Sequence, residues 1–532
     1  MTDRPHVRSA LAGAKRDLLV YDLTGIDEQY DTLRRELPGV LVRFAMKACP
    51  VPEVLTSLAD RGAGFDAASP GEIRQALATG VSPLDVHYGN TVKSDADIAD
   101  AHGLGITTFA TDCAEDVRAI AVNAPGARVF CRVATTGEGA LWGLTGKCGA
   151  DDAVAVLVEA QELGLVPAGV SVHVGSQQMT VGGWERAFDR LCEVREALES
   201  HGIRLDHVNL GGGLPAEGYL DSGGRPMTPP TAEIFAAIRA GMRRLGDDLR
   251  FVVEPGRYLV ADHGTIRAHV ARLTVRREPW LYLSCGRFNG LYEADQLRYR
   301  LEFPTREGGP LVPAVVAGPT CDSDDTLGGA PAPVPADLVS GDPVWIRSAG
   351  AYATSYTTQG FNGYAPLSCV AVRAERIRPI GDHDWDAIAL LEKEAYAASG
   401  ISEERAVLES RGRISPATSF VLETEDGVGG YLLALPYPPD EFPDPHRAET
   451  VRHRSANLHL HDIVVGEGLR GRGWARRLVR HLTETTPYER ISLVAVGGKA
   501  GFWAARGFHE HPEVPLPPGY GPGAVYMSRV IA

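Results

Sequence analysis

The feature that most limits how this chain can fold is a regular alternation of two kinds of segment between about Leu18 and Leu259. Short apolar runs rich in β-branched residues are expected to be strands and lie at 40–44, 86–88, 106–110, 129–133, 169–173, 207–210 and 251–253. Amphipathic segments between them are expected to be helices and include 53–61, 70–78, 151–163 and 184–200. Strand-helix repetition over ~250 residues is typical of a (β/α)8 barrel, and the alternative is an open, doubly wound sheet. The pattern alone does not choose between them.

After about residue 262 the pattern changes. Helical periodicity fades, glycine and proline become frequent, and β-like runs at 266–275, 280–283, 343–346 and 368–372 indicate a β-rich domain. A polar stretch at 373–384 is expected to be a linker. The remaining ~150 residues are enough for an independent domain. Helices are expected there at 385–399 and 475–484, and strands at 419–422, 428–435, 458–465 and 491–496.

Charge and composition exclude several classes of protein. The 532 residues include 53 Lys and Arg and 68 Asp and Glu, a net charge of −15, which disfavours nucleic acid and anionic membrane surfaces as partners. No segment approaches the ~20 consecutive apolar residues of a membrane-spanning helix, and residues 1–15 lack a signal-like apolar core. The eight cysteines form no CxxC pair, which favours reduced thiols and no metal site. We therefore expect a cytoplasmic protein.

Four short motifs sit at or just after expected strands, where the active sites of barrels are built. They cover 45–48, 171–176, 210–213 and 253–257. Lys47 ends an apolar strand, and partial desolvation would lower the pKa of its amine and make it a nucleophile toward carbonyl carbons. Gly211-Gly212-Gly213 lets backbone N–H groups approach an anion closely, and Arg257 adds a charged fork. Glu254 can hold a heteroaromatic nitrogen, while His173 offers a flat ring.

Each of these motifs also has a simpler explanation. A lone lysine after a strand is usually a surface residue, and three glycines often form only a turn. The run Glu-Pro-Gly-Arg at 254–257 is, taken alone, a tight turn with a surface ion pair. The order of the motifs along the chain, each at a strand end, favours a common site.

Longer matches surround these motifs. They lie at 44–48, 64–72, 173–176, 211–213, 254–258, 318–322, 350–352 and 361–363. In this order they resemble the fold-type III pyridoxal-phosphate decarboxylases, and within them the ornithine decarboxylase group, over about 19–364. The resemblance implies an α/β fold in which a (β/α)8 barrel at 24–260 binds pyridoxal 5′-phosphate and a β-rich domain combines 1–23 with 261–376. It also implies a homodimer with active sites at the interface.

The same resemblance implies a role for individual residues. Lys47 would form the Schiff base with the cofactor, His173 would stack on its ring, and Glu254 would pair with the ring nitrogen. The phosphate would be held by Ser176, Gly213, Arg257 and Tyr352, and the other cofactor-binding residues would be Asp66, Arg132, Gly211, Gly212, Pro255 and Gly256. Cys321 and Asp322 would reach in from the partner subunit to protonate the product carbon and to bind a distal ammonium. A carboxylate at the ring nitrogen favours decarboxylation, because the racemases of this fold have an arginine there.

One departure from the family pattern concerns the substrate. Ornithine decarboxylases have Asp-Gly after a strand of the β-rich domain, and that aspartate helps to bind the distal amine, but this chain has Cys285 followed by glycine. Cys285 therefore joins Asp322 and Tyr352 as an expected substrate-binding residue. Glu293 or Asp295 could replace the missing carboxylate. A basic amino acid such as ornithine, lysine or diaminobutyrate is the first expectation, and a modified or neutral amino acid is the alternative.

A second candidate site lies in the tail. An apolar strand at 458–465 leads into a glycine- and arginine-rich loop at 466–475 and then a helix, an arrangement that suits an anion at a helix N-terminus. A solvated basic turn is the simpler alternative. This loop and the later segment 500–508 resemble the GNAT acetyltransferases, and the resemblance covers about 380 to the end of the chain. It implies an α+β domain at 381–532.

The GNAT resemblance implies a site for acetyl-CoA as cosubstrate. Residues expected to hold the pyrophosphate are Arg470, Gly471, Arg472, Gly473 and Ala475, and the backbone of Ile463 and Val465 would pair with pantetheine. Many members have tyrosine where this chain has Trp503, so the general acid is left unassigned. Strand alternation predicts His459 and His461 on one face and Asp462 on the other, and His461 could accept a proton from an amine. A hydrogen-bonded structural histidine is the alternative.

Together the two resemblances imply a bifunctional enzyme that decarboxylates an amino acid and acylates an amine. Tethering would raise the concentration of the first product near the second site. The reverse order is also possible, because acylation of the distal amine would remove its charge. Two further alternatives are a tail that only senses acyl-CoA and a non-catalytic, decarboxylase-like binding protein.

Overall fold

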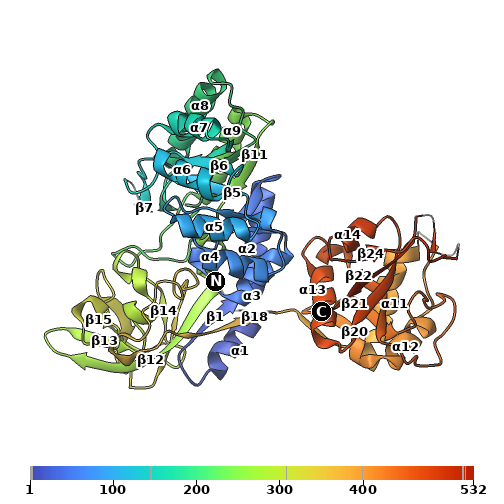
Figure 1. Cartoon of the computed structure of the whole chain (residues 1–532). Helices are drawn as coiled ribbons and strands as arrows, with labels where there is room; N and C mark the ends of the chain where they lie inside the picture. The colour runs from blue at the N-terminus through green and yellow to red at the C-terminus, as the bar shows by residue number, and fades with distance from the viewer. Residues whose placement is uncertain are drawn as a thin grey trace. The chain divides into compact units, whose positions relative to one another are not determined.

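The computed structural model describes residues 4–143, 146–306, 308–397, 400–517, 520–521 and 523–531. The chain forms two compact units, Met1–Arg373 and Ala374–Ala532, and each is described by itself (Figure 1). Of the expected helix at 385–399, the last two residues lie outside the described residues. No helix in the described part of the chain has both the length and the apolar character needed to cross a membrane.

The first unit contains a closed barrel of eight parallel strands, in the spatial order β10-β11-β2-β3-β4-β5-β6-β8. The strands are β2 Leu41–Ala45, β3 Gly64–Ala67, β4 Val86–Tyr88, β5 Thr108–Thr111, β6 Arg128–Arg132, β8 Val166–Ser171, β10 His207–Asn209 and β11 Arg250–Val253. Closure rules out the open, doubly wound sheet. The sequence did not predict β3 as a strand, because Gly-Phe-Asp-Ala contains no β-branched residue.

Helices connect the barrel strands, and local sequence explains where they begin. They are α2 Leu23–Glu36, α3 Pro52–Asp60, α4 Pro70–Ala78, α5 Asp95–Gly103, α6 Ala114–Asn123, α7 Ala153–Glu162, α8 Val181–Ser200, α9 Thr231–Leu245 and the short α10 Arg257–Val260. In α4, Ser69 Oγ accepts a hydrogen bond from Glu72 N at 3.3 Å, and Pro70 occupies the first turn. Ile73 and Ala76 are the fully buried face of this helix.

The second part of this unit is an eight-stranded sheet with the path β14-β17-β12-β13-β15-β16. Its strands are β1 Leu18–Asp22, β12 Gly264–Val275, β13 Pro279–Leu283, β14 Leu301–Glu302, β15 Leu311–Ala317, β16 Ala332–Pro335, β17 Pro343–Ile346 and β18 Ser368–Val372. β1 pairs antiparallel with β12 and parallel with β18, so the N-terminal strand is a central member of this sheet. The helix α1, Pro5–Gly13, packs on this region through Val7 and Leu11.

The second unit is a seven-stranded sheet in the order β19-β20-β21-β22-β23-β25-β24, covered by helices on both faces. Its strands are β19 Arg376–Pro379, β20 Ser419–Thr424, β21 Gly427–Pro436, β22 Asn457–Val465, β23 Arg490–Ala495, β24 His509–Glu510 and β25 Val525–Val530. The helices are α11 Trp385–Tyr396, α12 Arg405–Ile414, α13 Trp474–Thr485 and α14 Ala500–Ala504. One buried cluster joins α13 to the sheet through Leu478 and Leu482, and another joins α11 and α12 through Trp385 and Leu408.

Candidate active sites

Lys47 lies where β2 ends and a short 3-10 turn, Met46–Ala48, begins. Its neighbours Met46 and Ala48 are fully buried, whereas the Lys47 side chain projects into the barrel mouth and is open to solvent there. The surrounding protein partly desolvates the Lys47 amine, which lowers its pKa, but the Asp66 carboxylate, the Tyr352 phenol and Glu254 raise the pKa by more, so it lies above its ordinary value. The sequence-based expectation of a lowered pKa is therefore wrong, because it considered desolvation without the acidic groups that converge on this amine.

The acidic groups form a connected set through a residue that the sequence analysis missed. His87, the middle residue of β4, is 2% exposed and places Nε2 3.1 Å from Asp66 Oδ1 and 2.9 Å from Glu254 Oε1. Asn209 Nδ2 donates to the same Glu254 oxygen at 2.5 Å. Burial and Arg43 lower the pKa of His87, but Asp66 and Glu254 raise it by more. The only available signal was a histidine within a short apolar strand, which no motif marks.

His173 follows β8 and presents a neutral ring. Burial, Arg132 and Lys47 lower its pKa to about 3, so the imidazole is uncharged at neutral pH. Arg132 is the last residue of β6, and its charge also helps to lower the pKa of Asp66, whose burial alone would raise it. The His173 backbone is held by Thr135 Oγ1, which donates to its carbonyl oxygen at 2.7 Å.

The three glycines after β10 lie where side chains would not fit. A Cβ atom at Gly211 would come within 2.1 Å of the Val172 carbonyl oxygen, and its φ is +65°. At Gly212 it would approach the Glu254 carbonyl oxygen at 2.9 Å. Gly213 has a φ of +102°, and a Cβ atom there would lie 2.7 Å from the Gly175 carbonyl oxygen. The three glycines therefore allow neighbouring backbone segments to approach closely, and this segment is more than a surface turn.

Arg257 begins α10 and is the buried cation of the site. Its two terminal nitrogens both lie 2.6 Å from the Glu293 carboxylate, Nη1 also donates to Tyr219 Oη at 3.0 Å, and Nη2 lies 3.4 Å from Ser176 Oγ. The guanidinium carbon lies 4.5 Å from the Trp142 ring and 4.8 Å from the Tyr352 ring. Nε of Arg257 is buried and has no hydrogen-bond partner among the described residues.

The remaining positions of the motif frame the same mouth. The Pro255 carbonyl accepts from Ala45 N at 3.2 Å, and a Cβ atom at Gly256 would lie 2.9 Å from that of Ala48, so the β11 turn is held against the lysine turn. The Tyr352 N–H donates to the Ala48 carbonyl at 2.7 Å. This contact attaches the β-rich domain to the barrel at the lysine.

Of the three expected substrate-binding residues, Tyr352 lies at the barrel mouth, whereas Cys285 and Asp322 lie elsewhere, as does Cys321, the expected proton donor. Cys285, just after β13, is fully buried in the hydrophobic core, so it does not line an open site in this chain. Cys321 and Asp322 are exposed; Asn362 Nδ2 lies 3.6 Å from the Cys321 sulfur, and Asp322 Oδ1 accepts from Asp324 N. Within the described residues, neither makes a hydrogen bond or ion pair with the barrel mouth.

Glu293, expected as a possible substitute for the missing substrate carboxylate, is committed to Arg257 and is 7% exposed. Asp295 is more open and lies 3.3 Å from Arg287. Neither carboxylate therefore replaces the missing aspartate without giving up an arginine.

Comparison with known proteins identifies this arrangement. A family model described as the pyridoxal binding domain of pyridoxal-dependent decarboxylases matches residues 23–261. The chain is 33% identical to the lysine/ornithine decarboxylase of Selenomonas ruminantium over 353 residues, covering 65% of this chain and 87% of that protein. The chain belongs to the pyridoxal-dependent decarboxylase family.

Other members of this family resemble the chain to a similar degree. The diaminopimelate decarboxylase of Pseudomonas aeruginosa is 33% identical over 364 residues, covering 64% of this chain and 85% of that one. A crystal structure of the lysine/ornithine decarboxylase of Vibrio vulnificus complexed with putrescine matches with a TM-score of 0.62 at 27% identity, covering 69% and 97% of the two chains. The barrel and β-rich domain are thus those of a fold-type III decarboxylase, as the sequence predicted.

The second unit of this decarboxylase homologue has its own candidate site, where two parallel strands separate. β22 pairs with β21 along its length, but with β23 only from Asn457–Arg490 to Leu460–Leu493. Residues 461–465, which include Ile463 and Val465, therefore have one strand edge without a partner strand among the described residues. An extended ligand can pair with this free strand edge.

The loop after β22 leads into α13. Gly471 and Gly473 have φ values of +76° and +81°, and Gly473 is the residue that precedes the helix. Arg470 Nε donates to the Val465 carbonyl at 3.0 Å, so the arginine is tied to the end of the strand. Arg472 is exposed, and Ala475 lies in the first turn of α13. Gly473, the residue before the helix, has no side chain with which to cap that turn.

The expected distribution of side chains along β22 is wrong because the strand contains a bulge. His459 is opposite Leu435 and Asp462 is opposite Leu433, with the register shifting between them. Since Leu433 and Leu435 are two residues apart on one strand, His459 and Asp462 share a face. Asp462 accepts from Tyr396 Oη at 2.8 Å and from Tyr431 Oη, and burial raises its pKa to about 7.

A family model of the GNAT acetyltransferases matches residues 385–509. The second unit is therefore a GNAT domain, as the sequence predicted. Trp503 of this domain is 6% exposed and packs in the core with Phe502 and Phe508, so it does not provide a titratable group at the candidate site.

Proposed function

We propose that this chain is a bifunctional enzyme that decarboxylates an amino acid with pyridoxal phosphate and transfers an acyl group from CoA to an amine. The observation that carries the first activity is the convergence of Lys47, Asp66, Glu254 and the neutral ring of His173 at one barrel mouth. The second activity is supported by the opening beside β22 together with the loop that precedes α13.

The residues at the barrel mouth fit pyridoxal phosphate. The backbone at Gly211–Gly213 leaves space that Cβ atoms would fill, and the buried Nε of Arg257 has no partner among the described residues. Ser176 Oγ adds a hydroxyl beside the same guanidinium. A phosphate group would find backbone amides, a hydroxyl and a buried cation within one small region.

Each residue of the mouth has a distinct proposed role. Bound pyridoxal phosphate supplies an aldehyde that captures an amine and a ring that withdraws electrons from the bond to the departing carboxylate. Lys47 is the attachment point and, with a raised pKa, is a reservoir for a proton. Glu254 Oε1 accepts from His87 and Asn209, and its Oε2 would be available to hold the ring nitrogen. His173, being neutral, would contact the ring without repelling the protonated nitrogen.

The substrate is proposed to be a basic amino acid such as ornithine, lysine or diaminobutyrate. The relatives named above are lysine/ornithine and diaminopimelate decarboxylases, which supports a substrate with a second amine. In a homodimer, Cys321 would protonate the product carbon in the other copy's site and Asp322 would bind the distal ammonium there. Because Cys285 is buried, Asp322 would be the main charged contact, and a modified or neutral side chain is the alternative.

In the GNAT domain, the loop Arg470–Gly473 and the first turn of α13 are proposed to hold the pyrophosphate of acetyl-CoA. The open edge at Ile463 and Val465 would pair with pantetheine and bring the thioester toward His461. His461 would then take a proton from the acceptor amine. A tail that binds acyl-CoA without catalysis is the second candidate, favoured by the core position of Trp503.

The test uses the full chain with pyridoxal phosphate and a panel of amino acids, each with and without acetyl-CoA, and identifies products by mass spectrometry. We expect a diamine without acetyl-CoA and a monoacetylated diamine with it. Lys47→Ala should abolish the first product but still acetylate added diamine. An intact amino acid in every reaction would refute the decarboxylase, and diamine that stays unacetylated would leave only the acyl-CoA-sensing role for the tail.

A further inference from the structure

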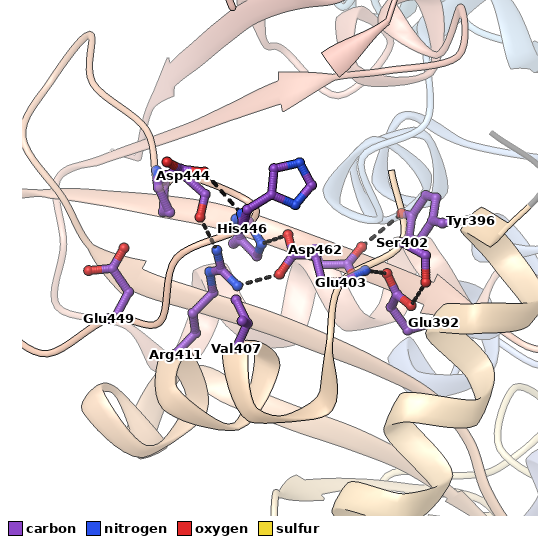
Figure 2. A network of polar contacts seen from close by, with 12 residues as sticks. Glu392, Tyr396, Ser402, Glu403, Val407, Arg411, Asp444, His446, Glu449 and Asp462 are labelled. Atoms are coloured by element: carbon purple, nitrogen blue, oxygen red, sulfur yellow. Dashed lines mark hydrogen bonds and ion pairs between the residues drawn. The ribbon is translucent and has the colours of Figure 1, made fainter. Parts of the chain in front are cut away.

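A buried polar network connects β22 of the GNAT domain to the segment between α11 and α12 (Figure 2). At its centre, Glu403 places one carboxylate oxygen 2.8 Å from His461 Nε2 and accepts a hydrogen bond from Arg411 with the other. The Glu403 side chain is 8% exposed and that of His461 is 5% exposed. The contact between Glu403 and His461 is therefore a hydrogen bond between a carboxylate and an imidazole that is largely shielded from water.

The rest of the network fixes Glu403 in place. Its own N–H donates to Glu392 Oε1 at 2.6 Å, and Ser402 Oγ donates to the other Glu392 oxygen at 2.6 Å, so this segment is held against α11. Arg411, which is 1% exposed, also donates from Nη2 to the Asp444 carbonyl at 2.8 Å. Figure 2 shows Arg411 between Asp444 and Glu403. A carboxylate restrained from three elements keeps one orientation.

This geometry decides which nitrogen of His461 is free. An ionised carboxylate only accepts hydrogen bonds, so a neutral His461 facing Glu403 carries its proton on Nε2 and its lone pair on Nδ1. Among the described residues, Nδ1 of His461 has no hydrogen-bond partner. Burial and the charge of Arg411 lower the pKa of His461 well below its ordinary value, which keeps the ring neutral.

His461 lies at the point where the two strands separate. It is the extra residue of the bulge in β22, directly after the last pair that β22 makes with β23, Leu460–Leu493. An acyl-pantetheine chain paired with the open edge at Ile463 and Val465 would end beside it. The bulge therefore presents an imidazole at the position that the thioester would reach.

We propose that Glu403 positions His461, through Nε2, so that His461 Nδ1 is the general base for the acceptor amine. This inference rests on the proposed acyltransferase activity. The neutral amine attacks the thioester carbonyl carbon, a C–N bond forms and the C–S bond breaks, and the thiolate leaves with CoA. The proton released by the amine nitrogen goes to His461 Nδ1, so atoms and charge balance.

The arrangement also predicts a pH dependence. Burial raises the pKa of Glu403 to about 7, although Arg411 and His446 act to lower it. Above that pH the carboxylate is ionised and fixes the Nε2–H form, and below it a protonated Glu403 donates to Nε2 instead and moves the ring proton to Nδ1. The titratable and charged groups that act on Glu403 or face it are Arg411, His446, Asp444, Glu392, His461, Asp462, Tyr396 and Tyr520.

The kinetic test compares Glu403→Gln with Glu404→Gln in the full chain. Glu404 is the next residue, is exposed and makes the same change of charge. With acetyl-CoA and cadaverine as probes, Glu403→Gln should lower kcat for acetyl transfer about 10- to 100-fold, less than the ~10²–10⁴-fold that a general base contributes, because His461 itself remains, and should leave the KM for acetyl-CoA within twofold. It should also remove the rise in kcat near pH 7. Equal kcat values and pH profiles for the two variants and the wild type would overturn the proposal.

A spectroscopic test reads the His461 tautomer in the wild-type chain and needs no turnover. In the full chain labelled with 15N-histidine, His461 should show a protonated Nε2 and an unprotonated Nδ1 at pH 8, and the reverse below about pH 6. The signal is assigned by its absence in His461→Gln. An Nδ1–H form at pH 8 would overturn the proposed orientation. A wild-type chain with the expected tautomer but no acetyl transfer would instead refute the proposed acyltransferase and, with it, the role of His461 as a base.

Discussion

Around Lys47, the protonation state of each group depends on the charges of its neighbours. The amine lies near Asp66 and Glu254, and these two carboxylates share the Nε2 proton of His87. Removing Asp66, His87 or Glu254 leaves the other two unbalanced where Asp66 and His87 are buried, and that is more costly than an equivalent change at the surface. Asp66, Glu254 and His87 thus form one coupled charge cluster at this mouth.

His87 makes the stability of the first unit depend on pH. Its folded-state pKa is raised above the ordinary value of 6.5, since Asp66 and Glu254 outweigh burial and Arg43. A raised pKa means that its stabilisation is complete below about pH 6.5 and is lost as the pH rises through the folded-state pKa. We expect His87→Gln to destabilise the first unit by about 1.5–3 kcal/mol at pH 6, with a smaller deficit at pH 9.

Thermal unfolding of the wild type and of His87→Gln at the two pH values measures this effect. The exposed His201, changed to Gln, is the matched control and should show no such difference. A deficit that is constant between pH 6 and pH 9 would contradict a charged His87.

The glycine triplet offers a second residue-level test. Gly211 and Gly202 both have positive φ, +65° and +74°, but a Cβ atom at Gly202 meets nothing within 4 Å, whereas at Gly211 it meets a carbonyl oxygen at 2.1 Å. Each alanine variant should lose about 1–2 kcal/mol for the left-handed conformation. Gly211→Ala should lose about 1–3 kcal/mol more from overpacking and bind pyridoxal phosphate more weakly, as measured by absorbance titration. Equal effects of the two variants would contradict the close approach.

The motifs in the sequence predicted which residues gather at the barrel mouth, but not their charge states. The positions of Lys47, Glu254 and Arg257 follow from strand ends, which the apolar pattern indicates. The raised pKa of Lys47 and the pairing of Arg257 with Glu293 depend on groups distant in sequence, whose distances only the folded chain provides.

Some features of the helices and strands can be predicted from local sequence signals, whereas others depend on how the strands pair in the fold. The start of α4 could be read from Ser-Pro followed by Glu72, since these residues cap a helix wherever it lies. The bulge in β22 could not, because the register of β22 is set by β21, and a one-residue shift moved Asp462 to the other face. β3 was missed because its burial, and not its β propensity, makes it a strand.

The cap of α4 is open to a direct test. Ser69→Ala removes the acceptor for Glu72 N and should destabilise the first unit by about 1 kcal/mol, whereas Ser69→Thr retains an acceptor and should cost only a few tenths. The midpoints of thermal unfolding of the three proteins measure this. Equal losses for Ala and Thr would show that packing, and not the cap, holds Ser69.

For the whole molecule, the division into two compact units predicts that each ligand stabilises one unit. A ligand at 100 times its Kd stabilises the unit that binds it by about 2.7 kcal/mol. We expect two transitions in calorimetry, the first unit's shifted by pyridoxal phosphate alone and the second unit's by acetyl-CoA alone. Lys47→Ala should weaken only the first shift. A single transition that moves with either ligand would contradict independent units.

The place of β1 between β12 and β18 also bears on the order in which the protein is made. A nascent chain exposes residues 18–22 early, yet the neighbour at 368–372 leaves the ribosome only when the first unit is almost finished. At roughly 5–20 residues per second this delay is on the order of tens of seconds. During that interval one edge of an apolar strand lacks its native neighbour, so we expect the growing polypeptide to be most open to wrong strand pairing until translation passes Val372.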